Sequence, residues 1–202
     1  MRWTSPPAEL SRAAFVAELD VLTSVYAAAM RPDPEQIAGR ESIMEQHSRY
    51  GGFRALAVRD QSPQQPGRIV GFSYGFRGAD GQWWHDTVAT ALTAKSGQAL
   101  SFAWLADSLE IAEVHVLPDF QHHGIGKSLV LGLAEGRPER TAVLSTPDRE
   151  STARRLYRGL GFEDLLTGYR FPGANVSYAV MGAVLPLRDQ FPGQASPRPS
   201  SS

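Results

Sequence analysis

The chain has 202 residues, of which 42% are hydrophobic and 20% charged, and its formal net charge is −1. These values fit one soluble globular domain with a substantial core, and the balanced charge argues against a nucleic-acid partner. The sequence contains no cysteine, which excludes disulfides, thiolate metal sites and a cysteine nucleophile and fits a reducing compartment. Because no membrane-spanning run or signal pattern is present, we expect a cytoplasmic protein with no membrane partner.

Two helices are predicted in the first 50 residues. Apolar residues at steps of three and four over 9–30 are typical of an amphipathic helix. A second helix is expected from residue 34 to about Tyr50. Asp33 would be its N-cap, Gln36 would complete a capping box, and Gly51-Gly52 would end it.

The next part of the chain alternates between strands and helices. The expected elements are a hairpin of strands 53–60 and 68–78, strand 109–118, helix 124–136, strand 141–146, a helix from 148 that breaks at Gly161, and a closing strand pair at 162–171 and 176–185. The strand–helix–strand unit 109–146 is predicted to be a right-handed crossover between parallel neighbours. The fold class is therefore α/β or α+β with a mixed sheet.

Two segments stand apart from this order. Residues 79–108 hold three of the four tryptophans and are expected to form one or two short helices around a break at Gly97. From residue 187 the chain is rich in proline and serine, so 187–202 is predicted to be a disordered tail. Residues 1–186 then form a single domain that carries the aromatic-rich insert 79–108.

The segment QHHGIGKSLV, residues 121–130, leads from a predicted strand into a predicted helix. Gly124 and Gly126 would let a ligand approach the backbone closely. The first N–H groups of a helix have no partner inside the helix, and the helix dipole adds positive potential there. Lys127 adds a cation beside them, so the segment predicts a phosphate-binding turn.

Two common nucleotide-binding patterns do not fit this turn. A Walker loop requires G-x-x-x-x-G-K-[ST], and Gln121 stands where its first glycine should be. The dinucleotide pattern G-x-G-x-x-G fails because Leu129 occupies the third glycine position.

A third pattern fits. The segment VHVLPDFQHHGIGKSLV resembles the acetyl-CoA-binding motif of the GCN5-related N-acetyltransferase (GNAT) superfamily, V-x-P followed by Q/R-x-x-G-x-G/A. The matching residues are Val116, Pro118, Gln121, Gly124 and Gly126. Downstream, ARRLYRGLGF at 153–162 resembles the second motif of that family, A-x-x-L-Y-x-x-x-G-F. The resemblance implies the GNAT fold, a mixed, mostly antiparallel central sheet with a splayed parallel strand pair and helices on both faces.

The resemblance also implies how a cofactor would bind. In the family, the strand before the loop splays from its parallel neighbour, and the pantetheine arm pairs with the exposed backbone. Here that segment is Val114, His115 and Val116. The pyrophosphate would bind loop residues Gln121, His122, His123, Gly124, Ile125, Gly126 and Lys127. For the side chains of the two loop histidines, plain solvent exposure is the alternative. Acetyl-CoA is the implied co-substrate, and no metal is expected.

The implied chemistry is direct acetyl transfer to a primary amine. Tyr157 occupies the place of the family's general acid for the departing thiolate, although it could instead be a core aromatic. Glu113 is our candidate for the general base, with Glu110 or a water chain as alternatives. Strand alternation puts these two carboxylates on opposite faces unless a bulge intervenes. Glu150 stands where the family often has an asparagine that bonds the pantetheine.

The acceptor side is less defined. By resemblance, its lining would include Tyr26, Met30, Trp83, Trp84, His85 and Trp104. The aromatic insert could form an acceptor wall or simply cover the sheet. A small-molecule or peptide amine is the implied partner, and a homodimer is common in the family. A non-catalytic acyl-CoA-binding or sensor module of the same fold is the alternative function.

Overall fold

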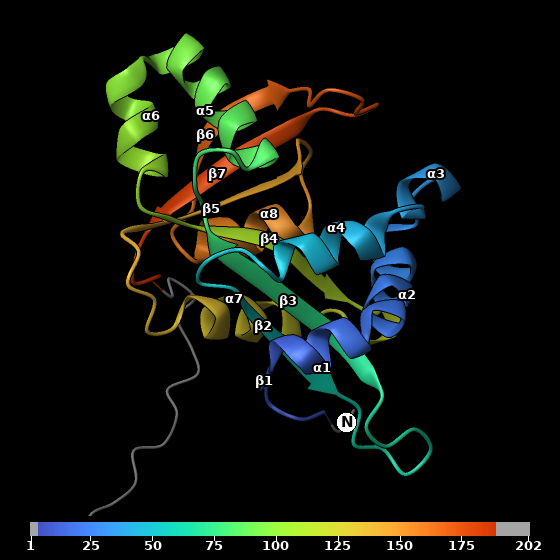
Figure 1. Ribbon diagram of the computed structural model, residues 1–202. Helices are drawn as coiled ribbons and strands as arrows, with labels where there is room; N and C mark the ends of the chain where they lie inside the picture. Colours follow the sequence, from blue (N-terminus) through green and yellow to red (C-terminus); the bar gives the residue numbers. More distant parts are fainter. Residues whose placement is uncertain (1–3, 189–202) are drawn as a thin grey trace, which may run out of the picture.

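The computed structural model describes residues 4–188, with the backbone only at positions 35 and 36. The predicted tail from 187 therefore lies almost wholly outside the described residues. Seven strands form one sheet in the order β1-β2-β3-β4-β5-β7-β6 (Figure 1). Their bounds are β1 Ala8–Leu10, β2 Arg54–Arg59, β3 Ile69–Arg77, β4 Ser108–Val116, β5 Thr141–Pro147, β6 Glu163–Tyr169 and β7 Tyr178–Val184. β4 and β5 are parallel and the other neighbouring pairs antiparallel, which confirms the predicted mixed sheet.

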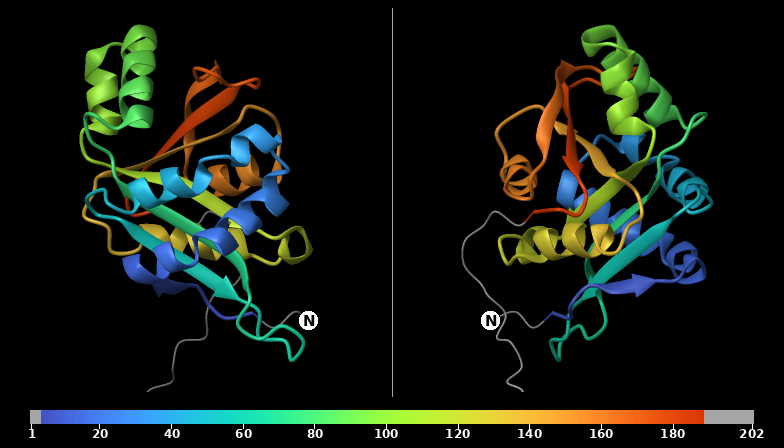
Figure 2. Two further views of the ribbon diagram at one scale, coloured as in Figure 1. Left: turned by 45° about the vertical axis from the view of Figure 1, so that its right-hand side comes forward. Right: turned by 90° about the vertical axis from the view of Figure 1, so that its left-hand side faces the viewer.

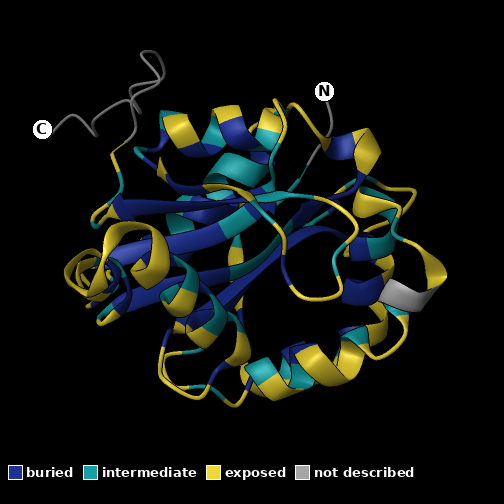
Figure 3. Cartoon of the chain, turned by 90° about the horizontal axis from the view of Figure 1, so that it is seen from above, coloured by how far each residue is buried: buried dark blue, intermediate teal, exposed yellow. Residues whose placement is uncertain are grey.

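Helices cover both faces of this sheet. Their bounds are α1 Arg12–Ala17, α2 Leu19–Met30, α3 Pro34–Ile37, α4 Arg40–His47, α5 Trp83–Ser96, α6 Gln98–Leu105, α7 Ile125–Ala134 and α8 Thr152–Gly159, with a 3-10 turn at Pro118–Phe120. The helices α1, α2 and α4 lie on one face, and α7 and α8 on the other (Figure 2). The strands between them carry about half of the buried residues (Figure 3). No helix within residues 4–188 is both long and apolar enough to cross a membrane.

The expected helix over 9–30 is wrong at its start. Residues Ala8–Leu10 form an edge strand instead, which pairs antiparallel with β2. Ser11 then caps a new helix, its hydroxyl accepting a hydrogen bond from the backbone N–H of Ala14 at 3.1 Å. The helix breaks at Glu18, whose φ of −108° and ψ of 15° leave the helical region. Helical periodicity could not reveal the strand because pairing with residues nearly 50 positions away decides it.

The second helix is also shorter than expected. Asp33 is its N-cap as predicted, but it makes no side-chain capping bond, and the Gln36 side chain of the expected capping box lies outside the described residues. Gly39 has a φ of 78°, a conformation that favours glycine, and it separates α3 from α4. The helix then ends at His47, before the predicted stop at Gly51-Gly52.

The parallel pair β4–β5 is paired over only three positions, Ser108, Leu109 and Glu110 against Thr141, Ala142 and Val143. Beyond them β4 stays paired with β3 on its other edge as far as Val116, while β5 stays paired with β7 as far as Pro147. The two strands therefore diverge. Among the described residues, no strand pairs with the edge of β4 that faces β5 over residues 111–116. The splayed pair expected from the resemblance is thus present.

The insert between β3 and β4 forms a helical hairpin, α5 and α6, broken at Gly97 as predicted. Its inner face packs with β5, β6 and β7 around a second hydrophobic cluster that includes Val88, Leu92 and Leu105. Two aromatic side chains of the hairpin remain in solvent: Trp83 is 58% and Phe102 72% exposed. The first turn of α5 faces the diverging strands, which makes the insert part of the candidate site described next.

Candidate active site

The glycine turn connects the end of β4 to α7. Gln121 ties the turn to the strand, because its side-chain amide donates to the Val116 carbonyl at 3.0 Å. His122 and Gly124 both adopt left-handed backbone conformations, with φ values of 63° and 80°, so the chain curls rather than running straight. A Cβ added at Gly124 would meet no atom within 4 Å. The turn is thus open at the helix N-terminus, where backbone N–H groups can receive an anion.

The loop residues named from the sequence divide into two kinds. His122 and His123 are exposed, whereas Ile125 is buried and anchors α7 in the core. The backbone N–H of Gln121 donates to the Pro118 carbonyl at 3.2 Å, so Gln121 holds the loop in shape. The first helical hydrogen bond of α7 runs from the Ser128 N–H to the Gly124 carbonyl at 3.0 Å.

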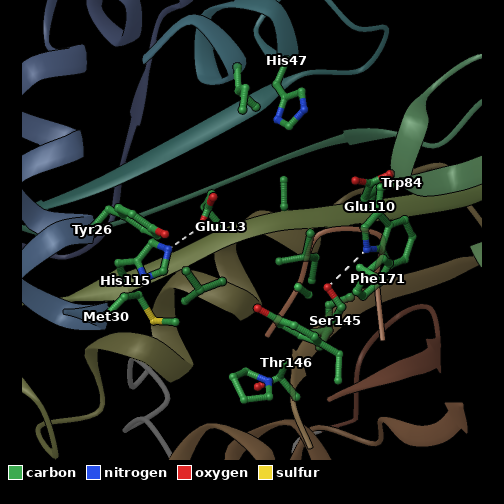
Figure 4. Close-up of a pocket in the computed structure, with 18 of the residues that line it drawn as sticks. Tyr26, Met30, His47, Trp84, Glu110, Glu113, His115, Ser145, Thr146 and Phe171 are labelled. Carbon is green, nitrogen blue, oxygen red and sulfur yellow. Dashed lines mark hydrogen bonds and ion pairs between the residues drawn. The ribbon is translucent and has the colours of Figure 1, made fainter. Parts of the chain in front are cut away.

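A cavity of about 610 Å³ lies where β4 and β5 diverge, a volume typical of small-molecule sites. Its walls come from α2, α4, the start of α5, β4, β5, α8 and the β6–β7 turn (Figure 4). Residues far apart in the sequence therefore meet at the point where the sheet opens.

A bulge in β4 decides which side chains enter this cavity. Tyr74 of β3 lies opposite Glu113, but the next residue, Gly75, lies opposite Ile111, so Ala112 is the extra residue. The bulge reverses the alternation of the strand, and Glu110 and Glu113 both line the cavity (Figure 4). The bulge needed to bring both carboxylates to the same face of the strand is therefore present.

Glu110 is a buried carboxyl group without a partner. The residue is 4% exposed, and its Oε2 atom has no hydrogen-bond partner in the described structure. Burial raises the pKa of Glu110 to about 8, because the charged form loses its hydration. At neutral pH such a group holds a proton weakly enough to exchange it, as a general acid–base group requires.

Glu113 is held by two partners. Its Oε1 accepts from Arg40 at 2.8 Å, and its Oε2 pairs with His115. Burial pushes the pKa of Glu113 upward, but the interactions with His115 and Arg40 outweigh it and hold the pKa below that of an ordinary carboxyl group. Arg40 in turn donates to the Tyr26 hydroxyl at 2.8 Å. Arg40 is 73 residues from Glu113 in the sequence, and no local pattern indicated it.

Tyr157 projects from α8 into the same cavity. It is 8% exposed, and its ring packs against Phe162 with centroids 5.8 Å apart. Burial, with a smaller contribution from Glu113, raises the pKa of Tyr157 to about 12. The phenol thus stays protonated and can donate a hydrogen bond, but it is a weaker acid than a free tyrosine.

The residues expected on the acceptor side fall into two groups. Tyr26, Met30, Trp83 and Trp84 line the cavity. His85 and Trp104 are not among its lining residues. His85 is buried with its Nε2 3.3 Å from the Leu105 carbonyl, and Trp104 packs within the second cluster.

The sequence did not indicate a hydrogen bond that joins the insert to the sheet. The Trp84 indole N–H donates to the Ser145 hydroxyl of β5 at 3.2 Å (Figure 4).

Three side chains at the start of α5 could hold a metal ion, although the sequence suggested no metal spacing. Ligand atoms of Asp80, His85 and Asp86 lie within 4.8 Å of one another. Asp86 already accepts two contacts from the Gly81 N–H at 3.1 and 3.2 Å. The group therefore has a structural role at this turn, and its members do not line the cavity.

Sheet divergence, an open glycine turn at a helix N-terminus and a buried carboxyl group beyond it agree with the fold that the resemblance implied. Residues 56–164 match the model of the family described as "Acetyltransferase (GNAT) domain". The chain belongs to this GNAT acetyltransferase family.

Known relatives agree with this assignment. A GCN5-like protein acetyltransferase of Mycobacterium tuberculosis is 33% identical, and the alignment covers 90% of this chain and 96% of the relative. Among solved structures, the NatC complex bound to Gag peptide and CoA has a TM-score of 0.64 at 15% identity, covering 92% of this chain and 99% of that one. The PaiA N-acetyltransferase of Thermoplasma acidophilum in complex with coenzyme A has a TM-score of 0.57 at 13% identity, covering 90% and 99%. At these identities the structures bear on the fold alone.

Proposed function

We propose that this protein transfers the acetyl group of acetyl-CoA directly to a primary amine of a small molecule or peptide. The observation that carries the proposal is the divergence of β4 from β5 after Glu110, next to an open glycine turn. The free edge of β4 can pair with the two amide groups of a pantetheine arm, and the turn can receive the pyrophosphate.

The cofactor would lie along residues already named from the sequence. Val114, His115 and Val116 supply backbone groups on the free edge of β4. The amides after Gln121, from His122 through Gly126, would donate to the pyrophosphate beside the open position at Gly124. Glu150, where the family often has an asparagine, is exposed and pairs with Arg158 at 2.9 Å, so we assign it no role with the cofactor.

We assign the general base to Glu110 in preference to Glu113. Glu110 is unpartnered and its pKa is about 8, whereas Glu113 is bonded to Arg40 and His115. An alkylammonium has a pKa near 10.4 in water, and an apolar cavity lowers it. The gap between the two groups is then small enough for proton transfer, directly or through one water.

The transfer needs no acyl-enzyme. The acceptor arrives as an ammonium, and one of its protons passes to the Glu110 carboxylate. The neutral nitrogen then forms a bond to the thioester carbon, the carbon–sulfur bond breaks, and the second proton lost by the nitrogen goes to the departing CoA thiolate. Backbone N–H groups of β4 near Val116 would polarise the carbonyl. Tyr157 would donate a hydrogen bond to the departing sulfur. Full proton transfer from a phenol with a pKa of about 12 to a thiolate is uphill, so we propose hydrogen bonding as its contribution.

The test combines calorimetry with a thiol-release assay. We expect CoA to bind and a panel of primary amines to release CoA thiol from acetyl-CoA. Binding without turnover across a broad panel would instead favour a non-catalytic acyl-CoA-binding module. Failure of CoA to bind at millimolar concentration would refute both functions. We also propose a cytoplasmic location, since a chain without cysteine fits a reducing compartment.

A further inference from the structure

The acceptor side of the cavity is the side toward α4 and the start of α5, where Glu110 points. Its walls are α4 with the following Tyr50, the first turn of α5, and the β6–β7 turn. The apolar and aromatic residues that line it are Ile43, Tyr50, Phe76, Trp83, Trp84 and Phe171. An amine that reaches Glu110 must carry its body between these side chains.

The inserted hairpin supplies one wall of this space. The Trp83 ring contacts Phe171 of the β6–β7 turn, with centroids 5.8 Å apart, so the two form one continuous aromatic surface. Trp84 is fixed by its hydrogen bond to Ser145 and lines the same cavity as Glu110 and Phe171 (Figure 4). The wall is therefore anchored at both α5 and the sheet before any acceptor arrives.

Most polar side chains around this space are already bonded to other protein groups. Gln82 uses both ends of its amide, donating to the Arg77 carbonyl and accepting from the Ala79 N–H, each at 3.1 Å. The Tyr50 hydroxyl accepts from Gln46 at 3.1 Å. A ligand with many hydroxyl or amide groups would thus lose hydrogen bonds to water and find few replacements.

Three further polar groups on the side toward α4 are bonded as well. His47 Nδ1 lies 3.1 Å from the Tyr74 hydroxyl, while Tyr26 and Arg40 are bonded to each other. The charge of Glu113 is balanced by Arg40 at 2.8 Å. A second ammonium group on the acceptor would consequently have no spare carboxylate to pair with on this side of the cavity.

Resting on the proposed acetyl transfer, we propose that the acceptor is a monoamine whose amino group is carried by an apolar alkyl or aryl body, and that Trp83 of the inserted hairpin selects it. Polyamines, polyhydroxylated amines and peptide α-amines are the classes that this lining disfavours. Each methylene that enters the aromatic space should improve kcat/KM roughly fourfold, the factor that corresponds to about 0.8 kcal/mol per buried CH₂.

The test measures thiol release from acetyl-CoA with butylamine, hexylamine, octylamine and phenethylamine, and with spermidine, kanamycin and Gly-Gly. We expect kcat/KM to rise along the alkyl series until the space is full, and the polar amines to fall at least tenfold below hexylamine. Trp83→Ala should lose at least tenfold with phenethylamine. The matched control is Phe102→Ala, which removes a 72% exposed aromatic from the same hairpin but outside the cavity lining, and should match the wild type.

The outcomes separate this inference from the proposed function. Equal or better turnover of spermidine, kanamycin or Gly-Gly would overturn the inference and leave acetyl transfer standing. Should no amine turn over, calorimetry of the alkyl series in the presence of CoA decides the point. Affinity that climbs with chain length in wild type but not in Trp83→Ala supports the apolar site without catalysis, and affinity independent of chain length overturns it.

Discussion

Replacing Glu110 by glutamine should remove the activity of the protein. It should also raise the unfolding free energy relative to the wild type, by an amount that grows as the pH rises. Folding raises the pKa of this carboxyl from 4.5 to about 8. The protonated carboxyl group of Glu110 therefore makes its full contribution to the free energy of unfolding below pH 4.5. This contribution is lost as the pH rises toward 8. At about 1.4 kcal/mol for each factor of ten in acidity, the loss is roughly 3 kcal/mol at pH 7 and roughly 5 kcal/mol above pH 8.

Glutamine is similar in shape and uncharged at every pH, so Glu110→Gln escapes this loss. The assay is urea unfolding of both proteins at pH 4.5, 7 and 8.5. The difference in unfolding free energy, variant minus wild type, should increase by roughly 3 kcal/mol between the first two pH values. Groups other than Glu110 titrate in both proteins and cancel. The same variant should lose between about 10² and 10⁴ in kcat, the range typical of a missing general base.

A difference in unfolding free energy that does not change with pH would refute the assignment of a neutral buried carboxyl group at Glu110. Glu113→Gln is the matched comparison on the same strand, and its sign is opposite. The pKa of Glu113 is lowered in the fold, so its stabilising contribution is present at neutral pH and is lost as the pH falls. Glu113→Gln should therefore cost more stability at pH 7 than at pH 4.

Four further results are expected. If Glu110 is the general base, kcat/KM of the wild type should rise with pH near 8, where Glu110 loses its proton. This rise should persist in Glu113→Gln, and its disappearance would show that Glu113 is the base instead. Tyr157→Phe should lower kcat about 10²-fold or more at unchanged affinity for CoA by calorimetry, and an unchanged kcat would exclude a role at the sulfur. Gly124→Val should abolish the heat shift caused by CoA, whereas Gly136→Val, equally strained at a φ of 66° and equally open, should keep it. Arg154→Met should cost about 2 kcal/mol in chemical unfolding, because the ion pairs of the buried guanidinium with Asp148 and Asp164 are lost while Asp164 keeps Arg158; a loss below about 0.5 kcal/mol would contradict that.

The family and the conformation of the glycine turn could be predicted because their determinants are local in the sequence. Val116, Pro118 and the glycines at 124 and 126 all lie within eleven consecutive residues. Backbone freedom and the unpaired N–H groups of a helix start depend on the nearest neighbours alone. The order of strands and helices beyond residue 50 was readable for the same reason.

Strands and side chains whose partners are distant in the sequence were predicted wrongly or not predicted. The short strand at Ala8–Leu10 looked helical because its apolar spacing fits either structure, and only β2 decides in favour of the strand. Arg40 carried no signal at all, since its ion pair with Glu113 forms across 73 positions.

The placement of the two carboxylates shows where local information ends. Residues 110 and 113 were candidates from the sequence, but their faces depend on the bulge at Ala112, which exists because β3 and β4 pair in a shifted register. Burial then raises the pKa of Glu110, which has no partner, whereas His115 and Arg40 lower the pKa of Glu113. The sequence determined the glycine turn and the helix start that follows it, since both depend only on neighbouring residues. Tertiary structure alone determined which carboxylate is free and which aromatic side chains surround it, since solvent exclusion is a property of the assembled fold.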